Sequence, residues 1–368
     1  MYDKRKFLLV LLILTLIFSL FTIFVSSEGG LALSAKSAAL YEPKTKTFLY
    51  TKNPNTRLSM ASTTKIMTAL IALEELDPEE EIDVDKRAIG IEGSSIYLKE
   101  GERLKAIDLI YALILQSAND AAEALAYRIS GSIEGFSLLM NEKALSLGLK
   151  DTNFENPHGL DSKNHYTTAH DLAIIGAKAL SNPLFREISS SYKKVIESSL
   201  MTRILVNHNK LLKSYEGCIG VKTGYTKKSG RSLVSAAEKE SLTLIAVTIN
   251  APDDWSDHRK MLDYGYSLLL AKTLASPGEF RYKIPVIGGS EDFVYVSNKE
   301  SLERIFKKEN QDYKTEVRLS RFLTAPVSTD TPLGKVIFTQ NGTIIDSLDL
   351  YAESPIEKSA SRRHFFLK

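Results

Sequence analysis

Ser62-Thr63-Thr64-Lys65 opens a segment, Ser62 to Leu76, in which apolar residues recur at helical spacing. Residues three positions apart lie on one face of a helix, so the serine hydroxyl and the lysine amine can meet. A serine hydroxyl is a weak nucleophile, and a lysine can take its proton when burial or a neighbouring cation lowers the lysine pKa. Backbone N–H groups at the start of the helix can then hold an oxyanion. The stretch indicates a nucleophile with its base.

A Ser-x-x-Lys pattern is weak evidence when it stands alone. A single match more often marks a capping serine followed by a solvated lysine. The same spacing occurs at Ser190–Lys193 and Ser191–Lys194, in a polar stretch that no apolar helical run follows. The interpretation of Ser62 therefore depends on the other motifs of the chain.

Two further motifs follow Ser62 in the chain. Ser117-Ala118-Asn119 comes at the end of an apolar run, and Lys222-Thr223-Gly224 comes after Gly217-Cys218-Ile219-Gly220-Val221. A closely similar combination, in this order, is found in penicillin-binding proteins and class A β-lactamases. Each motif has look-alikes elsewhere in the chain, so the longer sequence around each one decides.

That longer sequence is far more specific. The segments concerned are Ala61–Thr68, Gly93–Leu98, Ser117–Ala122, Asn156–Asp161, Tyr166–Ala173 and Val221–Thr226. Together they resemble the low-molecular-mass D-alanyl-D-alanine carboxypeptidases, which are serine peptidases of the penicillin-binding type. The resemblance runs from about Ser37 to the C-terminal region.

The resemblance implies an acyl transfer in two steps on peptidoglycan stem peptides that end in D-Ala-D-Ala. It implies no metal and no organic cofactor, and it implies covalent inhibition by β-lactam antibiotics. Backbone N–H groups of Ser62 and Tyr225 would hold the oxyanion. The expected catalytic residues are Ser62, Lys65 and Ser117, and the expected substrate-binding residues are Asn119, Lys222, Thr223, Gly224 and Tyr225.

Three other functions share parts of this pattern. A D,D-endopeptidase acting on peptidoglycan cross-links would use the same site, and only substrate assays separate it from a carboxypeptidase. A class A β-lactamase uses a Glu-x-x-Leu-Asn string, which this chain lacks. In a non-catalytic envelope scaffold we would expect some of the motif residues to be replaced, yet they are all present. His158, in a loop, and Asp171, in a capping box, are interpreted as structural residues.

Composition limits the partners, the disulfides and the cellular location that the chain can have. The 368 residues carry a net charge of +2 with acids and bases mixed, which argues against nucleic acid as a partner. A single cysteine, Cys218, excludes an internal disulfide. Lys4-Arg5-Lys6 precedes the uncharged run Phe7–Val25, so residues 1–27 are predicted to be a signal peptide or a membrane anchor. The rest of the chain should then lie outside the cytoplasm.

The order of apolar patterns predicts an α+β fold. A hairpin at Ala38–Thr51 and strands at Ile219–Thr223, Leu233–Ala237 and Leu242–Asn250 enclose a helical middle. Between the Ser62 helix and Ala106 we expect a loop-rich segment through Gly90, Gly93 and Gly101, and after the last strand a helix over Asp257–Leu270. We expect a β-lactamase-like catalytic domain over residues 28–274, with helices on an antiparallel sheet. A linker at 275–279, a small all-β domain at 280–355 and a tail at 356–368 should follow. Within the all-β domain, Asn341-Gly342 predicts a hairpin turn. The tail shows no extended amphipathic pattern, which favours the N-terminal run as the anchor.

Overall fold

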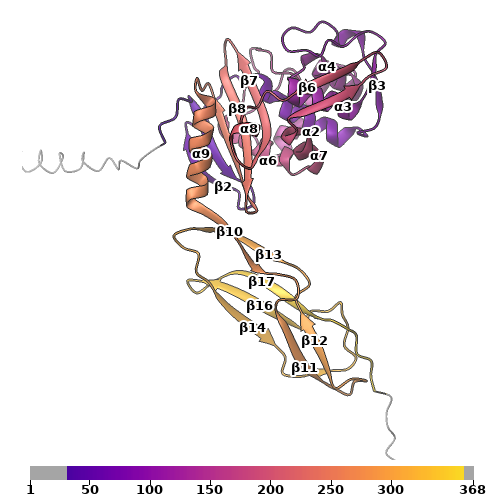
Figure 1. The fold of residues 1–368 in the computed structure, drawn as a ribbon, viewed down its shortest axis with the longest axis vertical. Coiled ribbons are helices and arrows are strands. Elements are labelled where there is room, and N and C mark those ends of the chain that lie inside the picture. Colours follow the sequence, from indigo (N-terminus) through magenta and orange to yellow (C-terminus); the bar gives the residue numbers. More distant parts are fainter. Residues whose placement is uncertain (1–30, 360–368) are drawn as a thin grey trace, which may run out of the picture.

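The computed structural model describes residues 31–359, so the predicted signal or anchor lies outside the described residues. Figure 1 shows two parts arranged end to end, a mixed helical and sheet part and an all-β part. A five-stranded sheet in the order β2-β1-β9-β8-β7 organises the first part, and every neighbouring pair is antiparallel. Its strands are β1 (Ser37–Glu42), β2 (Thr47–Lys52), β7 (Cys218–Thr226), β8 (Gly230–Lys239) and β9 (Leu242–Ile249). The predicted α+β class is confirmed.

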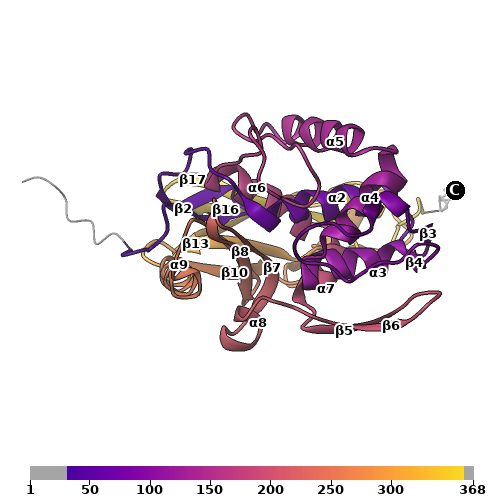
Figure 2. The same ribbon diagram turned by 90° about the horizontal axis from the view of Figure 1, so that it is seen from above.

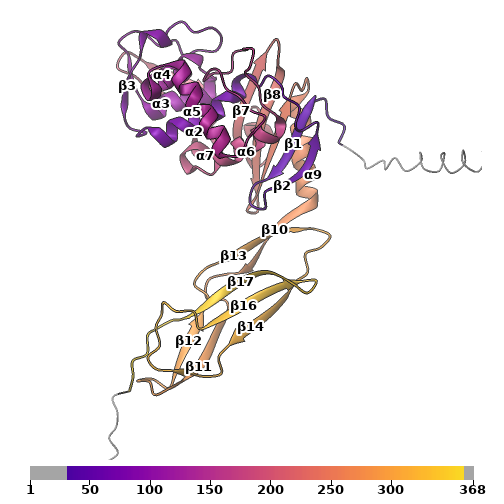
Figure 3. The same cartoon turned by 180° about the vertical axis from the view of Figure 1, so that it is seen from behind.

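Helices cover both faces of this sheet because side chains alternate along each strand. In β1, Ala39 belongs to the core that includes α2 and α6, whereas Ala38 and Leu40 belong to the core beneath α9. Figures 1 and 3 show α9 on one side of the sheet and α2 and α6 on the other. The helices are α2 (Lys65–Glu75), α3 (Ala106–Tyr111), α4 (Asn119–Ser130), α5 (Ile133–Ser146), α6 (Ala169–Leu180), α7 (Pro183–Ser190), α8 (Leu211–Ser214) and α9 (Asp254–Leu268).

The two helices that carry the serine motifs depart from the regular form at the motifs. The predicted helix at Ser62 begins as a 3-10 turn, Ala61–Thr64, and becomes α-helical only at Lys65. The run from Ala106 that leads to Ser117 divides into α3 and a π-helical turn, Ala112–Gln116. Such turns are frequent at functional sites.

Several short strands were not predicted. The polar stretch at Ser190–Lys194 leads into a hairpin of β5 (Lys193–Glu197) and β6 (Thr202–Val206). Figure 2 shows this hairpin along the outside of α3. β3 (Glu81–Asp83) pairs with β4 (Arg103–Lys105) within the segment predicted as loop. The outer sides of β5 and β6 mix polar and apolar residues, which hides the alternation, and β3 and β4 have only three residues each, too few for an alternating pattern to stand out.

The second part is built only from strands. A six-stranded sheet has the order β14-β16-β17-β12-β11-β15, and β10 pairs with β13. The predicted turn Asn341-Gly342 joins β16 to β17 with both residues at positive φ, as a type I′ turn requires. The strands are β10 (Leu269–Ala275), β11 (Arg281–Ile287), β12 (Phe293–Ser297), β13 (Leu302–Lys307), β14 (Lys314–Leu319), β15 (Leu323–Thr324), β16 (Gly334–Gln340) and β17 (Thr343–Ala352).

The two parts join without an intervening loop. The predicted helix ending at Leu270 stops at Leu268, and β10 begins at the next residue. The N–H of Lys308 donates to the carbonyl oxygen of Leu268 at 2.8 Å, and Glu303 lies 3.8 Å from the ammonium of Lys44. The all-β part therefore contacts the base of the five-stranded sheet. Within residues 31–359 we find no helix with the length and apolarity needed to span a bilayer.

Candidate active site

Ser62 and Lys65 meet at the start of α2. Lys65 is fully buried, and its Nζ lies 3.1 Å from the Ser62 hydroxyl oxygen. The same Nζ donates to Asn119 Oδ1 at 2.6 Å and to the carbonyl oxygen of His158. Three oxygens thus fix the position of the amine, while Ser62 remains partly exposed.

The surroundings of Lys65 favour its neutral form. Burial lowers the pKa of Lys65 well below its ordinary value, the charge of Lys222 lowers it further, and Asp120 opposes this. A neutral amine has a lone pair, so Lys65 can accept the proton that a lysine in water could not. The arrangement therefore allows Lys65 to remove the Ser62 proton as the Ser62 oxygen attacks a carbonyl carbon.

Ser117 and Asn119 are placed by the π-helical turn that precedes them. Ser117 has a φ of 61°, in the left-handed region, and is 5% exposed. The N–H of Asn119 donates to the carbonyl oxygen of Ser94 at 2.7 Å, and its side-chain amide donates to the carbonyl oxygen of Glu92. The Asn119 side chain is thus fixed at both ends, with its oxygen on Lys65.

The edge strand β7 supplies the remaining predicted residues. Lys222 is 1% exposed, burial lowers its pKa from 10.5 to about 7, and its Nζ donates to the carbonyl oxygen of Thr223 at 2.8 Å. A Cβ on Gly224 would lie 3.1 Å from the backbone nitrogen of Ser62. The absent side chain lets the strand pass close to the nucleophile. Tyr225 is 66% exposed at the end of this stretch.

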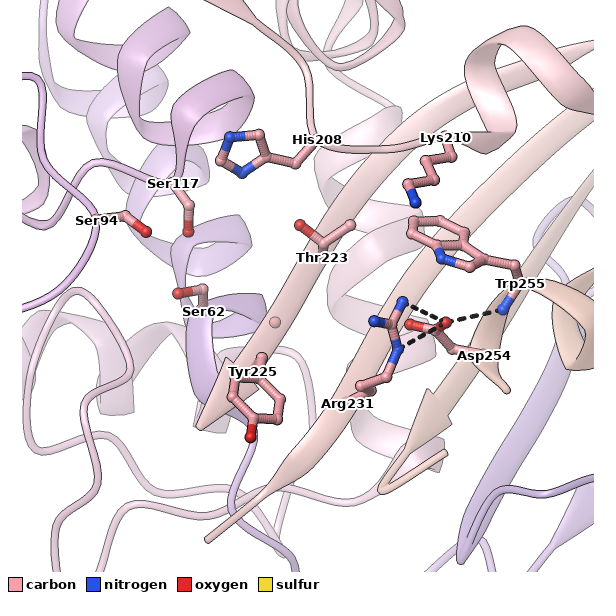
Figure 4. A pocket seen from close by; sticks show the side chains of 11 residues that line it. Ser62, Ser94, Ser117, His208, Lys210, Thr223, Tyr225, Arg231, Asp254 and Trp255 are labelled. Carbon is pink, nitrogen blue, oxygen red and sulfur yellow. Dashed lines mark hydrogen bonds and ion pairs between the residues drawn. The ribbon is translucent and has the colours of Figure 1, made fainter. Parts of the chain in front are cut away.

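A cleft of about 360 Å³ connects these residues, and Figure 4 shows its side chains. Of the predicted set, Ser62, Ser117, Thr223, Gly224 and Tyr225 line it. In Figure 4 the Ser62 and Ser117 hydroxyls lie close to each other on one side of Thr223. The structure brings the other three, Lys65, Asn119 and Lys222, to the same centre, but each is buried behind the lining.

Six residues of the lining were not predicted as site residues: Ser94, His208, Lys210, Arg231, Asp254 and Trp255. The segment Gly93–Leu98 was part of the resemblance, so Ser94 had a signal in the sequence. The others come from the segment before α8, from β8 and from the first turn of α9, and nothing in their local sequence marks a site. Burial and the charge of Lys222 lower the pKa of His208, so its imidazole favours the neutral form.

The two residues set aside as structural keep that interpretation. The imidazole of His158 contacts Glu123 at 3.3 Å, and only its backbone carbonyl reaches Lys65. The N–H of Asp171 donates to the hydroxyl of Thr168, which caps α6 as predicted. Neither side chain lines the cleft. Among residues 31–359, no group of three or more His, Cys, Asp or Glu side chains is arranged to hold a metal ion.

Comparison with known proteins gives two family matches and a set of relatives. The family described as D-alanyl-D-alanine carboxypeptidase matches residues 24–253, and the C-terminal domain of penicillin-binding protein 5 matches residues 271–358. D-alanyl-D-alanine carboxypeptidase DacF of Bacillus subtilis is 34% identical over 337 residues, covering 89% of this chain and 85% of the relative. DacA of Haemophilus influenzae is 30% identical, covering 86% and 84%.

Solved structures agree with these matches. Penicillin-binding protein 5 from Haemophilus influenzae has a TM-score of 0.64 at 28% identity, covering 89% of this chain and 98% of that one. The Streptomyces K15 DD-transpeptidase has a TM-score of 0.62 at 31% identity, covering 65% of this chain and 99% of that one. The chain belongs to the D-alanyl-D-alanine carboxypeptidase family of serine peptidases.

Proposed function

We propose that Ser62 is the nucleophile with which this chain removes the terminal D-alanine from peptidoglycan stem peptides. The observation that carries the proposal is the fully buried Lys65 amine, 3.1 Å from the Ser62 hydroxyl. Its lowered pKa makes it a base at neutral pH. The family membership of the chain supports the reaction class.

The first step forms the acyl-enzyme. Lys65 takes the proton of Ser62, whose oxygen attacks the carbonyl carbon of the penultimate D-alanine. The N–H groups of Ser62 and Tyr225 stabilise the oxyanion, and the close approach of Gly224 to the Ser62 nitrogen supports this pairing. The C–N bond then breaks as Ser117 passes its proton to the departing amine and receives in turn the proton that Lys65 took from Ser62.

Substrate binding uses the strand β7 and the Ser117-Ala118-Asn119 motif. Thr223 lines the cleft and offers its hydroxyl to the terminal carboxylate. Lys222 is buried and bonded to the Thr223 carbonyl, so it acts through its charge on this carboxylate and on Lys65. Asn119 orients Lys65 and the substrate amide. In the second step, water adds to the acyl carbonyl while Lys65 takes one of its protons, and the ester bond breaks as that proton passes to the Ser62 oxygen.

The place of action follows from the substrate. Peptidoglycan lies outside the cytoplasmic membrane, and the basic and apolar residues within 1–27 have the composition of an export signal or anchor. We therefore assign the catalytic domain to the outer side of the membrane, with β-lactams as covalent inhibitors. The all-β domain contributes no side chain to the cleft, so we assign it a spacing role.

The test is release of free D-alanine by the full chain from diacetyl-L-Lys-D-Ala-D-Ala, with Ser62→Ala as the control. We expect steady release by the wild type and none by the variant. A cross-linked peptide dimer is assayed in parallel, because cleavage of the dimer without D-alanine release would identify an endopeptidase instead. Equal release by both proteins would overturn the assignment of Ser62.

A further inference from the structure

The cleft continues beyond the part that the proposed reaction uses. If Thr223 holds the terminal carboxylate, the leaving D-alanine lies over Thr223, beside Ser62 and Ser117. Figure 4 shows further lining residues across Thr223 from Ser62, namely Lys210, Arg231, Asp254 and Trp255. We call these four residues the leaving-group shelf. A methyl side chain is too short to cover them, so the leaving D-alanine leaves the shelf empty.

The shelf is built from three elements that the sheet brings together. Arg231 stands in β8 directly opposite Tyr225 of β7, so both side chains lie on the same face of the sheet. Asp254 and Trp255 form the first turn of α9, and Lys210 immediately precedes α8. The shelf therefore lies on the α9 face of the sheet, next to the edge strand that binds substrate.

Its acid is already compensated within the shelf. Arg231 donates to Asp254 Oδ1 through Nε at 3.0 Å and Nη2 at 2.7 Å, and the N–H of Trp255 donates to the same oxygen at 2.9 Å. The Asp254 side chain is 4% exposed, whereas that of Arg231 is 41% exposed. The buried carboxylate is thus covered by the guanidinium, and the positive partner is the one that faces the cleft.

The second cation of the shelf, Lys210, forms no ion pair with a carboxylate of the described residues. Lys210 is exposed, and no carboxylate of residues 31–359 lies within 4.0 Å of its ammonium. The indole of Trp255 lies between Lys210 and Arg231 in Figure 4, and the Arg231 guanidinium carbon is 5.6 Å from the indole centroid. An aromatic face between two cations suits a chain with an aliphatic stem and a carboxylate at its end.

We propose that the leaving-group shelf binds the side arm of a leaving residue larger than alanine, an arm that carries a second carboxylate. This inference rests on the proposed function, because it takes the position of the leaving residue from that reaction. It names a further class of substrate for the same site: peptides whose leaving D-residue carries an acidic side arm. The aliphatic stem of the arm packs on Trp255, and its carboxylate pairs with Lys210 and Arg231.

The experiment compares three substrates that share the acyl part diacetyl-L-Lys-D-Ala. Their leaving residues are D-alanine, D-2-aminoadipate and the side-chain amide of D-2-aminoadipate. The acid and the amide have the same length, so the ratio of their kcat/KM values isolates the charge of the arm. We expect the acid to be preferred by about fivefold, as for one partly exposed ion pair. The D-alanine substrate reports whether the proposed function holds.

Variants locate the preference on the shelf. Lys210→Gln should reduce the ratio of acid to amide toward one. Arg231→Gln together with Asp254→Asn should do the same, because this double variant removes both charges and leaves two neutral groups that can still bond. Lys213→Gln is the matched control. It removes an equal charge one helical turn away, from a lysine that packs on Tyr192 and does not line the cleft.

The outcomes separate the two claims. A ratio of about five that falls in the shelf variants and persists in Lys213→Gln supports the shelf. A ratio near one in a wild-type protein that releases D-alanine overturns the shelf and leaves the proposed function standing. A ratio that the shelf variants do not change also overturns it. Failure to release any leaving residue from any of the three substrates would overturn the proposed function itself.

Discussion

Replacing Lys222 by methionine should make the protein more stable while it abolishes efficient catalysis. Lys222 is 1% exposed, and burial lowers its pKa from 10.5 to about 7. Each pKa unit corresponds to about 1.36 kcal/mol, so the shift opposes folding by roughly 4 kcal/mol at pH 7. Methionine gives up one hydrogen bond, to the Thr223 carbonyl, worth about 1 kcal/mol. The expected gain in the free energy of unfolding is therefore about 3 kcal/mol at pH 7.

The pH dependence of this gain gives the sharper test. Between pH 7 and 10.5 the unfolded chain keeps the Lys222 proton and the folded chain does not. The unfolded state then binds more protons, so wild-type stability from this group rises as pH rises. The advantage of Lys222→Met should accordingly shrink over this range.

Urea denaturation at several pH values measures this difference directly, because the midpoint and slope give the free energy of unfolding. Lys65 is present in both proteins, and loss of the Lys222 charge raises the Lys65 pKa in the variant, which adds to the advantage of Lys222→Met in the same direction. In the same variant, we expect D-alanine release to slow by about two orders of magnitude, because the charge that acts on Lys65 and on the substrate carboxylate is lost. A variant that is less stable at pH 7, or whose advantage does not change with pH, would show that Lys222 is not a destabilising buried amine with a lowered pKa.

Three further substitutions test the parts around the cleft. Asn119→Ala removes the 2.6 Å bond to Lys65 and should slow penicillin acylation by about 10²-fold, read by stopped-flow labelling. Gly93→Ala places a Cβ at 2.8 Å from the Asn119 amide at a φ of 92°, so D-alanine release should fall at least tenfold while a fluorescence melt still shows cooperative unfolding. Glu102→Gln leaves Arg203 unpaired in a site where both side chains are at most 9% exposed, and urea denaturation should show a loss of roughly 3–5 kcal/mol.

The spacing of apolar residues along the chain predicts much of the fold. The hairpin around Pro43, the helix after Lys65 and the turn Asn341-Gly342 were predicted because alternation, helical spacing and turn chemistry all act locally. The β5–β6 hairpin was not predicted, because its outer face exposes Val195 and Ile204 in place of polar residues. The end of α9 was placed too late because Leu269 and Leu270 continue the apolar spacing of the helix into a strand.

The site residues, too, divide into those that local sequence predicts and those that only the folded structure places. Ser62, Lys65, Ser117 and Lys222 belong to short motifs, so the sequence was enough to bring them into one hypothesis. Arg231 and Trp255 became part of the cleft only because β8 and α9 meet beside β7, which no local pattern records. The burial of Lys222 behind Thr223 was equally invisible, since strand alternation alone does not say which face turns toward the nucleophile. Tertiary packing decides such positions.

The site of penicillin acylation tests the assignment of Ser62 as the nucleophile most directly. The full chain is incubated with benzylpenicillin, digested with trypsin and analysed by mass spectrometry, with Ser62→Ala and Ser117→Ala treated alongside. We expect one penicilloyl group, on the Ser62 hydroxyl, which is absent from Ser62→Ala and forms more slowly in Ser117→Ala. A penicilloyl group on Ser117 or on any other residue, or an adduct that persists in Ser62→Ala, would contradict this assignment.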